Sequence, residues 1–324
     1  MENSRNKTVL VKDTDAAWYV SELATRCPQY RYIAAADDDA ALRVADQADI
    51  IVGLAPALSE TLIKAAPQLE WVQALTTGVD NLVAMTTLHP SVALTNCGGF
   101  HGPQMSELAF LMMLSLARDF PRMIANQQQK TWARWPQSLL LGKTVTIVGV
   151  GAIAEDLASR CGAFGMTVTG VSNGRSDVPG FARIDKRSAL VEAAAQCDFL
   201  VVLLPYDATS HHIIDATVLA AMRPSAMLIN ISRGGCVDEV ALRSALEQGQ
   251  IAAAGLDVFA TEPLTPDDPI WTAPNILITP HIGGMSDIYK HQALPSVAHN
   301  LTAYSTGGAG QLRGLIQRDK GPDA

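Results

Sequence analysis

The chain has 324 residues, which is long enough for two domains with buried cores, although length alone does not prove that count. Hydrophobic residues make up 48% of it and charged residues 17%, a composition that excludes a disordered chain. Its 32 acidic and 24 basic residues give a net charge of −8. That charge argues against nucleic acid or an anionic membrane as the partner, because both need basic patches.

The sequence also predicts the compartment and the absence of a metal site. The first residues, MENSRNKTVLVKDTD, lack the apolar core of a signal peptide, and no window reaches the roughly 18 apolar residues of a membrane span. The absence of a Cys-x-x-Cys pair favours reduced thiols in the cytoplasm; the cysteines are Cys27, Cys97, Cys161, Cys197 and Cys236. His211 and His212 are adjacent and so point apart, which does not suit a shared metal ion.

The first hundred residues alternate short apolar runs with helical stretches. Buried strands are predicted at VLV around Val9, in ADIIVGL ending at Leu54, in LEWVQAL ending at Leu75 and in SVALTN ending at Asn96. Segments 15–27 and 59–66 have helical spacing and suitable caps. This order predicts a parallel sheet with helices on both faces.

A long apolar helix is predicted from Pro103 to about Phe120, and the polar stretch 127–144 predicts a connection or an interface arm. A second alternation begins at Lys143, with strands in TVTIVGV, MTVTGV, DFLVVLLP, AMLINIS, AAAGLDVF and NILITP. It predicts a doubly wound sheet. A last helix and tail, from about Ala293, are expected to pack back on the first unit.

The stretch GVGAIAEDLA begins with a glycine pattern, Gly149-x-Gly151-x-x-Ala154, between a predicted strand and a predicted helix. Gly149 permits a tight turn, and Gly151 lets the backbone approach a pyrophosphate at the start of the helix. Alanine is tolerated at the third position, whose role is close packing of helix on strand. Strand, turn, helix and strand follow in order within about thirty residues, which predicts a dinucleotide site.

The end of the next strand, GVSNGRSD, bears on which dinucleotide binds. An NAD site usually has an acid there for the ribose 2′-hydroxyl, but this chain has Ser172 and Asn173, with Arg175 just beyond. Hydroxyl, amide and guanidinium groups can donate to a 2′-phosphate, whereas a carboxylate repels it. NADP(H) is therefore favoured and NAD(H) stays possible, since a shifted loop would bring Asp177 back.

Further motifs complete an ordered set. They are TTGVDN (residues 76–81), LLP (203–205), NISRGG (230–235), GLDVFATEP (255–263) and TPHIGG (279–284). With the glycine pattern they closely resemble the D-isomer-specific 2-hydroxyacid dehydrogenase family, including its glyoxylate and hydroxypyruvate reductases, over roughly residues 50–305. The resemblance implies an α/β fold of two doubly wound parallel-sheet domains with the active site in the cleft between them. Residues 1–100 and 293–324 would form a flavodoxin-like substrate domain, and 101–292 a Rossmann dinucleotide-binding domain.

The resemblance also assigns catalytic roles. Arg233 would bind the carboxylate of a 2-keto acid or 2-hydroxy acid and polarise its keto oxygen, a task that suits a permanently charged planar fork. His281 would exchange a proton with that oxygen. Glu262 would orient the His281 ring and favour its charged form, since a nearby carboxylate stabilises imidazolium.

Other contacts are implied in the same way. The turn at Thr77 and Gly78 would complete the carboxylate site, and Leu54 would border the substrate's variable group. Asp257 would pair with the nicotinamide amide. The cofactor contacts implied in full are Gly149, Gly151, Ala152, Ile153, Ser172, Asn173, Arg175, Leu204, Pro205, Ile231, Ser232, Arg233, Asp257, His281 and Gly283.

Two alternatives and one assembly question stay open at this stage. A formate or phosphite dehydrogenase would have the same fold, and so would a regulatory protein that senses a dinucleotide; retention of Arg233, Glu262 and His281 favours an enzyme. The family implies a homodimer, and the acidic net charge, as stated above, argues against a nucleic-acid or membrane partner. Trp132 and Trp135 lie in the arm that reaches a neighbouring active site in some relatives, and unchanged kinetics after their replacement by alanine would contradict that role here.

Overall fold

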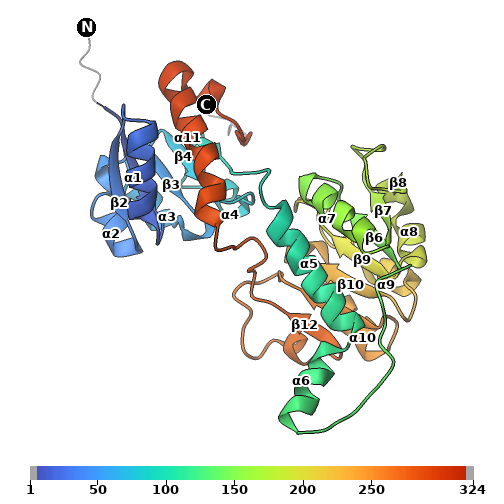
Figure 1. Ribbon diagram of the computed structural model, residues 1–324. Helices are drawn as coiled ribbons and strands as arrows, with labels where there is room; N and C mark the ends of the chain where they lie inside the picture. Colours follow the sequence, from blue (N-terminus) through green and yellow to red (C-terminus); the bar gives the residue numbers. More distant parts are fainter. Residues whose placement is uncertain (1–5, 319–324) are drawn as a thin grey trace. The chain divides into compact units, whose positions relative to one another are not determined.

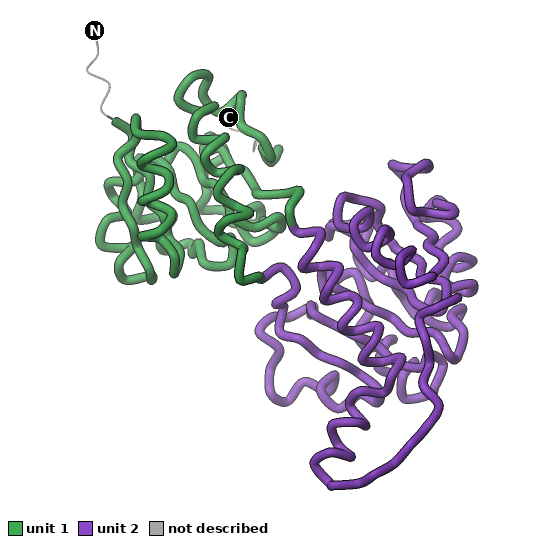
Figure 2. The backbone as a smooth tube through the Cα atoms, viewed as in Figure 1, with its two compact units in different colours: residues 1–100, 286–324 green, residues 101–285 purple. Residues whose placement is uncertain are grey.

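The computed structural model describes residues 6–318, which form two compact units (Figure 2). Unit 1 contains the described residues up to Phe100 together with those from Ser286 onward, and unit 2 runs from His101 to Met285. The second change of unit therefore comes seven residues before the expected boundary at 292/293. It does so because the last long helix begins at Tyr289 and belongs whole to unit 1.

Unit 1 is a five-stranded parallel sheet with helices on both faces (Figure 1). Its strands are β1 (Thr8–Lys12), β2 (Arg31–Ala35), β3 (Ile50–Gly53), β4 (Trp71–Ala74) and β5 (Ala93–Thr95), in the order β2-β1-β3-β4-β5. Its helices are α1 (Ala16–Arg26), α2 (Asp38–Leu42), α3 (Glu60–Lys64), α4 (Asp80–Val83) and α11 (Tyr289–Gly307). This strand order is that of flavodoxin-like folds.

Strands β1 and β3, inside the sheet of unit 1, are buried along their whole length because both faces of the sheet are covered. Leu10 of β1 packs in the core that also contains residues of α2, α3 and α4. Its neighbours Val9 and Val11 face the opposite core, where Tyr19 of α1 and Val297 of α11 lie. Successive side chains of one strand thus enter two different cores, as the period of two requires.

Unit 2 is a seven-stranded parallel sheet, ordered β12-β11-β10-β9-β6-β7-β8. The strands are β6 (Thr144–Val148), β7 (Thr167–Val171), β8 (Arg183–Asp185), β9 (Phe199–Val202), β10 (Met227–Asn230), β11 (Ala253–Leu256) and β12 (Ile276–Ile278). The helices are α5 (Gly102–Ala117), α6 (Phe120–Gln128), α7 (Ala152–Ala163), α8 (Leu190–Gln196), α9 (Ala216–Ala221) and α10 (Glu239–Glu247). From β6 the chain winds to one side through β7 and β8, then returns to β9 on the other side. The carboxyl end of β6 is therefore the switch point at which such sheets bind ligands.

Two cores cover the faces of this second sheet. Val145 and Ile147 of β6 pack with helices α5 and α7, whereas Val148 packs with α8, α9 and α10. Two of the methionines of the long apolar helix, Met112 and Met113, are fully buried, in line with the expected packing role. The α/β class and the doubly wound sheets predicted from the sequence are confirmed.

The structure differs from the sequence prediction in three respects. Strands β2 and β8 are not apparent from the sequence, because both lie at sheet edges and have mostly part-exposed side chains. The long helix ends at Ala117 rather than near Phe120, since Asp119 takes a left-handed conformation with φ 53° and a new helix, α6, starts before Pro121. The last helix starts at Tyr289, four residues before Ala293.

Three further findings concern residues 6–318. None of the helices described there is both long and apolar enough to cross a bilayer. Within the same stretch, no group of three or more His, Cys, Asp or Glu side chains is arranged to hold a metal ion. All five cysteines are buried and unpaired.

Candidate active site

The glycine pattern forms a tight turn between β6 and α7. Gly149 has φ 102°, a conformation that only glycine adopts readily, and a Cβ atom there would lie 2.7 Å from the Leu203 carbonyl oxygen. Gly151 caps α7 without a side-chain hydrogen bond, and a Cβ on it would meet nothing within 4 Å. Ala154 is fully buried, where a small side chain lets α7 approach the sheet. The turn thus leaves open space at a helix N-terminus, which fits a diphosphate.

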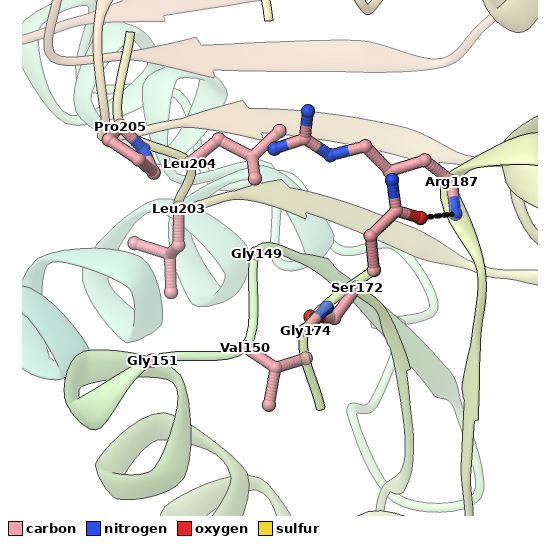
Figure 3. Close-up of a pocket in the computed structure, with 10 residues that line it drawn as sticks. Gly149, Val150, Gly151, Ser172, Gly174, Arg187, Leu203, Leu204 and Pro205 are labelled. Carbon is pink, nitrogen blue, oxygen red and sulfur yellow. Dashed lines mark hydrogen bonds between the residues drawn. The ribbon is translucent and has the colours of Figure 1, made fainter. Parts of the chain in front are cut away.

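A pocket of about 270 Å³ adjoins this turn at the carboxyl ends of β6, β7, β8 and β9 (Figure 3). Its lining residues are Gly149, Val150, Gly151, Ser172, Asn173, Gly174, Arg187, Leu203, Leu204 and Pro205. Six of them, Gly149, Gly151, Ser172, Asn173, Leu204 and Pro205, are among the expected cofactor contacts. Of these ten lining residues, none carries a carboxylate, and Arg187 alone is charged.

The loop after β7 is closed by its own side chains. The Ser172 hydroxyl accepts hydrogen bonds from the amides of Gly174 and Arg175, at 3.2 and 3.3 Å. Asn173 Oδ1 accepts from the Arg187 amide at 3.0 Å. The Arg175 side chain is not part of the pocket lining and forms an exposed ion pair with Glu155. The structure therefore brings Ser172 and Asn173 to the pocket but leaves Arg175 outside it.

Arg233 follows β10 on a turn that Asn230 holds. The buried Asn230 side chain donates to the Arg233 carbonyl at 2.9 Å and accepts from the amide and hydroxyl of Ser232, at 3.2 and 2.9 Å. Gly234 packs directly on the backbone after β11, since a Cβ on it would lie 1.8 Å from the Phe259 carbonyl carbon. This contact brings the Arg233 turn against the segment that leads to Glu262.

We expect Gly234→Ala to destabilise the protein, because the added methyl group would meet backbone atoms that cannot rotate away. Overpacking of this kind typically costs about 1–3 kcal/mol. Thermal unfolding followed by circular dichroism should show a lower midpoint. Gly162→Ala is the matched control: it lies in α7 with nothing within 4 Å of its Cβ, so it should leave the midpoint unchanged or raise it. An unchanged midpoint for Gly234→Ala would contradict the close contact.

His281 and Glu262 form a hydrogen-bonded pair at the same edge of the sheet. His281 Nδ1 donates to Glu262 Oε2 at 2.6 Å, while Glu262 Oε1 accepts from the Phe259 amide at 2.8 Å. The pair fixes which imidazole nitrogen faces the carboxylate and leaves Nε2 as the nitrogen available to a ligand. His281 has φ 53°, a strained value for a non-glycine residue. Strained backbone conformations of this kind cluster at active sites and ligand-binding sites.

The two groups shift one another's pKa. The hydrogen bond with Glu262 raises the pKa of His281 above its usual value of 6.5, although burial of the ring acts in the opposite direction. Burial by itself would raise the pKa of Glu262, but the hydrogen bonds from His281 and from the Phe259 amide outweigh it and lower that pKa. The positive charge of Arg233 lowers the pKa of both residues. The site therefore favours an ionised Glu262 beside a His281 that readily accepts a proton.

Asp257 holds the loop that carries His281. It is almost fully buried after β11; its Oδ1 accepts from the Thr279 hydroxyl at 2.5 Å and from the Ile282 amide at 3.0 Å. Its Oδ2 accepts from the Gly283 amide at 2.9 Å, and the His281 amide donates to the Asp257 carbonyl oxygen at 2.8 Å. These bonds fix the backbone on both sides of His281, so Asp257 has a positioning role whatever else it binds.

In unit 1 the expected substrate contacts share one sheet edge. Leu54 follows β3 and the turn of Thr77 and Gly78 follows β4, and these two strands are neighbours. The turn is held from both sides: Thr77 Oγ1 donates to the Cys97 carbonyl at 2.9 Å, and Thr76 Oγ1 donates to the Gly78 carbonyl at 2.7 Å. Its backbone is therefore ordered.

The remaining expected contacts lie in unit 2. Ala152 and Ile153 are the first residues of α7, Ile231 and Ser232 lie between β10 and Arg233, and Gly283 follows His281. A side chain at Gly283 would clash with Leu108 at 2.5 Å and with Asp257 at 2.9 Å, which explains the glycine. Ala152, Ile153, Ile231, Ser232 and Gly283 do not line the pocket of Figure 3.

Three residues of the site have roles that the sequence interpretation missed. Arg187 lines the pocket, but it follows the short edge strand β8, which has no apolar pattern to mark it. Asn230 holds the Arg233 turn and Thr279 binds Asp257. Both stand inside the motifs NISRGG and TPHIGG, so their polar side chains next to a strand end were the available signal.

The comparisons with known proteins agree with this geometry. The sequence pattern of the family described as D-isomer specific 2-hydroxyacid dehydrogenase, NAD binding domain, matches residues 110–283. D-3-phosphoglycerate dehydrogenase of Mycobacterium bovis is 32% identical over 300 residues, which cover 90% of this chain and 56% of that protein. The chain thus spans about half the length of the first curated relatives that it matches.

Solved structures resemble the chain over nearly its whole length. A D-isomer specific 2-hydroxyacid dehydrogenase family protein from Aeromonas salmonicida subsp. salmonicida is 33% identical, with a TM-score of 0.89 and coverage of 97% of this chain and 100% of that one. An NADPH-dependent glyoxylate/hydroxypyruvate reductase from Sinorhizobium meliloti, in complex with NADP and sulfate, is 26% identical, with a TM-score of 0.79 and coverage of 96% and 98%. The fold, the nucleotide-binding turn and these matches together show that the chain belongs to the D-isomer-specific 2-hydroxyacid dehydrogenase family and contains its nicotinamide-dinucleotide-binding domain.

Proposed function

We propose that this protein is an oxidoreductase that interconverts a 2-keto acid and the corresponding D-2-hydroxy acid with a nicotinamide dinucleotide. The observation that carries the proposal is the hydrogen-bonded pair of His281 and Glu262 at the sheet edge where Arg233 also lies. An acid–base histidine beside a fixed cation is the arrangement needed to protonate a carbonyl oxygen next to a carboxylate.

The chain's own residues bind the substrate and move one proton. Arg233 pairs with the substrate carboxylate and draws electron density from the keto group, so that the carbonyl carbon accepts hydride more easily. His281 donates its Nε2 proton to the carbonyl oxygen during reduction and recovers it during oxidation. Glu262 keeps the ring oriented and stabilises the charged imidazolium. Hydride transfer is the chemistry that a nicotinamide dinucleotide supplies when bound.

Binding is proposed to use both units. In unit 2 the open turn at Gly149 and Gly151 would receive the diphosphate, and Asp257 would keep the His281 loop in place while meeting the nicotinamide amide. In unit 1 the ordered amides of Thr77 and Gly78 would bind the substrate carboxylate, with Leu54 against its variable group. The common position of these residues at strand ends supports the proposal.

We further propose that NADP(H) is preferred over NAD(H). Support comes from the pocket after β7, whose ten lining residues include hydroxyl, amide and guanidinium groups and no carboxylate. A carboxylate at this place would repel the 2′-phosphate of NADP(H). Without a carboxylate, the 2′-hydroxyl of NAD(H) lacks the partner that it usually has in NAD sites. The reductase from Sinorhizobium meliloti, whose structure contains NADP, is a further argument for this preference.

The proposed direction is reduction, with glyoxylate, hydroxypyruvate or a larger 2-keto acid as substrate. An NADPH preference suits reduction, and that Sinorhizobium relative is named as a glyoxylate/hydroxypyruvate reductase. The Mycobacterium relative adds D-3-phosphoglycerate as a compound to test.

Initial-rate kinetics test the function directly. Glyoxylate, hydroxypyruvate, pyruvate and phenylpyruvate are each reduced with NADPH and with NADH; oxidation of D-3-phosphoglycerate, formate and phosphite is followed in parallel. We expect turnover of at least one 2-keto acid and a higher kcat/KM with NADPH. Turnover of formate or phosphite alone would assign a different reaction to this fold. Dinucleotide binding without turnover of any compound would instead favour a regulatory protein.

We also propose that the protein is a homodimer assembled through the start of unit 2. Leu111, Phe120, Ile124 and Trp132 form a set of exposed apolar residues along α5, α6 and the arm, and Trp132 is 88% exposed. Exposed apolar groups of this kind mark association surfaces. We expect light scattering to give twice the mass of the chain, and Phe120→Glu to halve it. Val240→Glu, at an exposed apolar residue of α10, should leave the mass unchanged. A monomeric wild-type protein would contradict the proposal.

A further inference from the structure

Hydrogen bonds join the ends of β7 and β8 at the far side of the pocket from the glycine turn. The Ser172 amide donates to the Asp185 carbonyl at 2.8 Å, and the Arg187 amide donates to Asn173 Oδ1 at 3.0 Å. The two loops are therefore fixed to one another at the place where the sequence pattern puts the adenosine ribose. Arg187 enters the pocket lining because of these bonds, although it is fifteen residues beyond Ser172 in the chain.

The Arg187 side chain extends across the pocket. Figure 3 shows it running from its backbone at one edge toward the segment of Leu203 to Pro205 at the other. Its Nη1 donates to Thr209 Oγ1 at 2.9 Å, and Thr209 Oγ1 in turn donates to Asp207 Oδ1 at 2.7 Å. A neutral hydroxyl therefore holds the guanidinium, and its positive charge is not cancelled by a direct carboxylate contact among residues 6–318.

The other arginines of this region differ in that respect. Arg175 forms an ion pair with Glu155, and Arg183 forms one with Asp185 at 2.7 Å. Neither of them lines the pocket. A guanidinium already paired with a carboxylate must give up that partner to bind a phosphate, whereas Arg187 has only to leave, or share, a hydroxyl.

We propose that Arg187 is the residue that binds the 2′-phosphate of NADP(H) and so determines the preference for NADP(H) over NAD(H), in place of Arg175. This inference rests on the proposed dinucleotide function. The planar guanidinium of Arg187 can place two N–H donors against the phosphate oxygens. The side-chain amide of Asn173 and the hydroxyl of Ser172 add neutral donors beside it. Thr209 is a positioning residue, because it holds the guanidinium inside the pocket before the ligand arrives.

Binding of fragments tests the inference without any turnover. Adenosine 2′,5′-bisphosphate and adenosine 5′-monophosphate differ by the 2′-phosphate, and calorimetry gives the Kd of each, alongside those of NADPH and NADH. We expect Arg187→Ala to weaken binding of the bisphosphate and of NADPH by about 10- to 100-fold, the usual effect of losing a charged hydrogen-bonding pair, and to change the monophosphate and NADH less than about threefold. Arg187→Lys should recover part of the loss, because a point charge remains without the fork.

Two comparison variants complete the design. Arg175→Ala should change the NADPH Kd less than about threefold, and so should Arg243→Ala, a surface arginine of α10 that pairs with Glu247 at 3.5 Å. Equal losses of NADPH and NADH in Arg187→Ala would mean that Arg187 stacks on adenine and would overturn the proposal. A selective NADPH loss in Arg175→Ala alone would overturn it as well. Because these readouts need no substrate, they are independent of whether a 2-keto acid is reduced.

Discussion

We expect His281→Ala to abolish most of the 2-keto acid reductase activity while leaving dinucleotide binding intact. The histidine is the proposed proton donor, and loss of a positioned general acid lowers kcat by typically about 10²–10⁴-fold. Its ring lies at the carboxyl end of β12, away from the residues that line the pocket after β7, so the NADPH Kd should stay within about threefold of the wild-type value. Steady-state kinetics with the best 2-keto acid and calorimetry with NADPH measure the two effects separately.

The matched control is His299→Ala, which removes an exposed histidine from α11 and should leave kcat unchanged. A His281→Ala variant that retained wild-type kcat would remove the histidine from the mechanism. A variant that lost NADPH binding to the same degree as kcat would show instead that its loop is needed to form the nucleotide site.

The pH dependence gives a second readout of the same pair. Reduction needs protonated His281, so kcat/KM should be highest at low pH and fall as pH rises through the histidine pKa. Because the hydrogen bond with Glu262 raises the pKa of His281, that fall should occur above pH 6.5, the ordinary value. Glu262→Gln removes the charge and should move the fall to lower pH; in the oxidative direction the rising limb should move the same way. An unshifted profile would contradict the role of Glu262.

The second large effect is expected for Arg233→Lys. The substitution keeps a positive charge but loses the planar fork that can hold a carboxylate and reach the keto oxygen together. Loss of one donor that stabilises developing charge costs about 10²–10³-fold in kcat, and KM should rise as well because the carboxylate is held by fewer bonds. Kinetics over a wide substrate range separate the two parameters.

Arg243→Lys is the control for an arginine outside the site, and both of its parameters should stay at wild-type values. The Arg233 backbone stays held by the Asn230 side chain through the Arg233 carbonyl oxygen, so Arg233→Lys should fold, and its thermal midpoint is measured beside its kinetics. Equal kcat and KM for Arg233→Lys and wild type would exclude the proposed contact between Arg233 and the substrate carboxylate.

The sequence was sufficient to predict an element wherever a local residue pattern is compatible with only one local structure. The ten apolar runs predicted to be strands all contain strands of the two parallel sheets, because a short apolar run between helices is typical of a parallel strand. The turn at Gly149 was predictable for the same reason, because only glycine tolerates both its φ of 102° and the adjacent Leu203 carbonyl. The pattern failed at two of the four edge strands, β2 and β8, whose part-exposed residues have no clear period.

The arrangement of side chains at the sheet edge was decided by tertiary structure. Arg175 and Arg187 are both close to strand ends, and nothing in their local sequence says which one faces the pocket. Glu155 of α7 forms an ion pair with Arg175. Arg187 instead lines the pocket, where its backbone amide is bound by Asn173 and its guanidinium by Thr209. Those partners come from separate segments of the chain, a helix and two loops, and they come within hydrogen-bond distance only once the sheet of unit 2 has assembled.

The sequence by itself thus determined the α/β class, the family and the identities of the residues proposed for catalysis, since each follows from residue types at short spacing. The tertiary structure decided that Glu262 and His281 meet at 2.6 Å, that Asp257 holds the histidine loop, and that Arg187 rather than Arg175 lines the pocket. The physical reason is that hydrogen bonds and ion pairs depend on distances between strand ends that are far apart in the chain, and only the assembled sheet sets those distances.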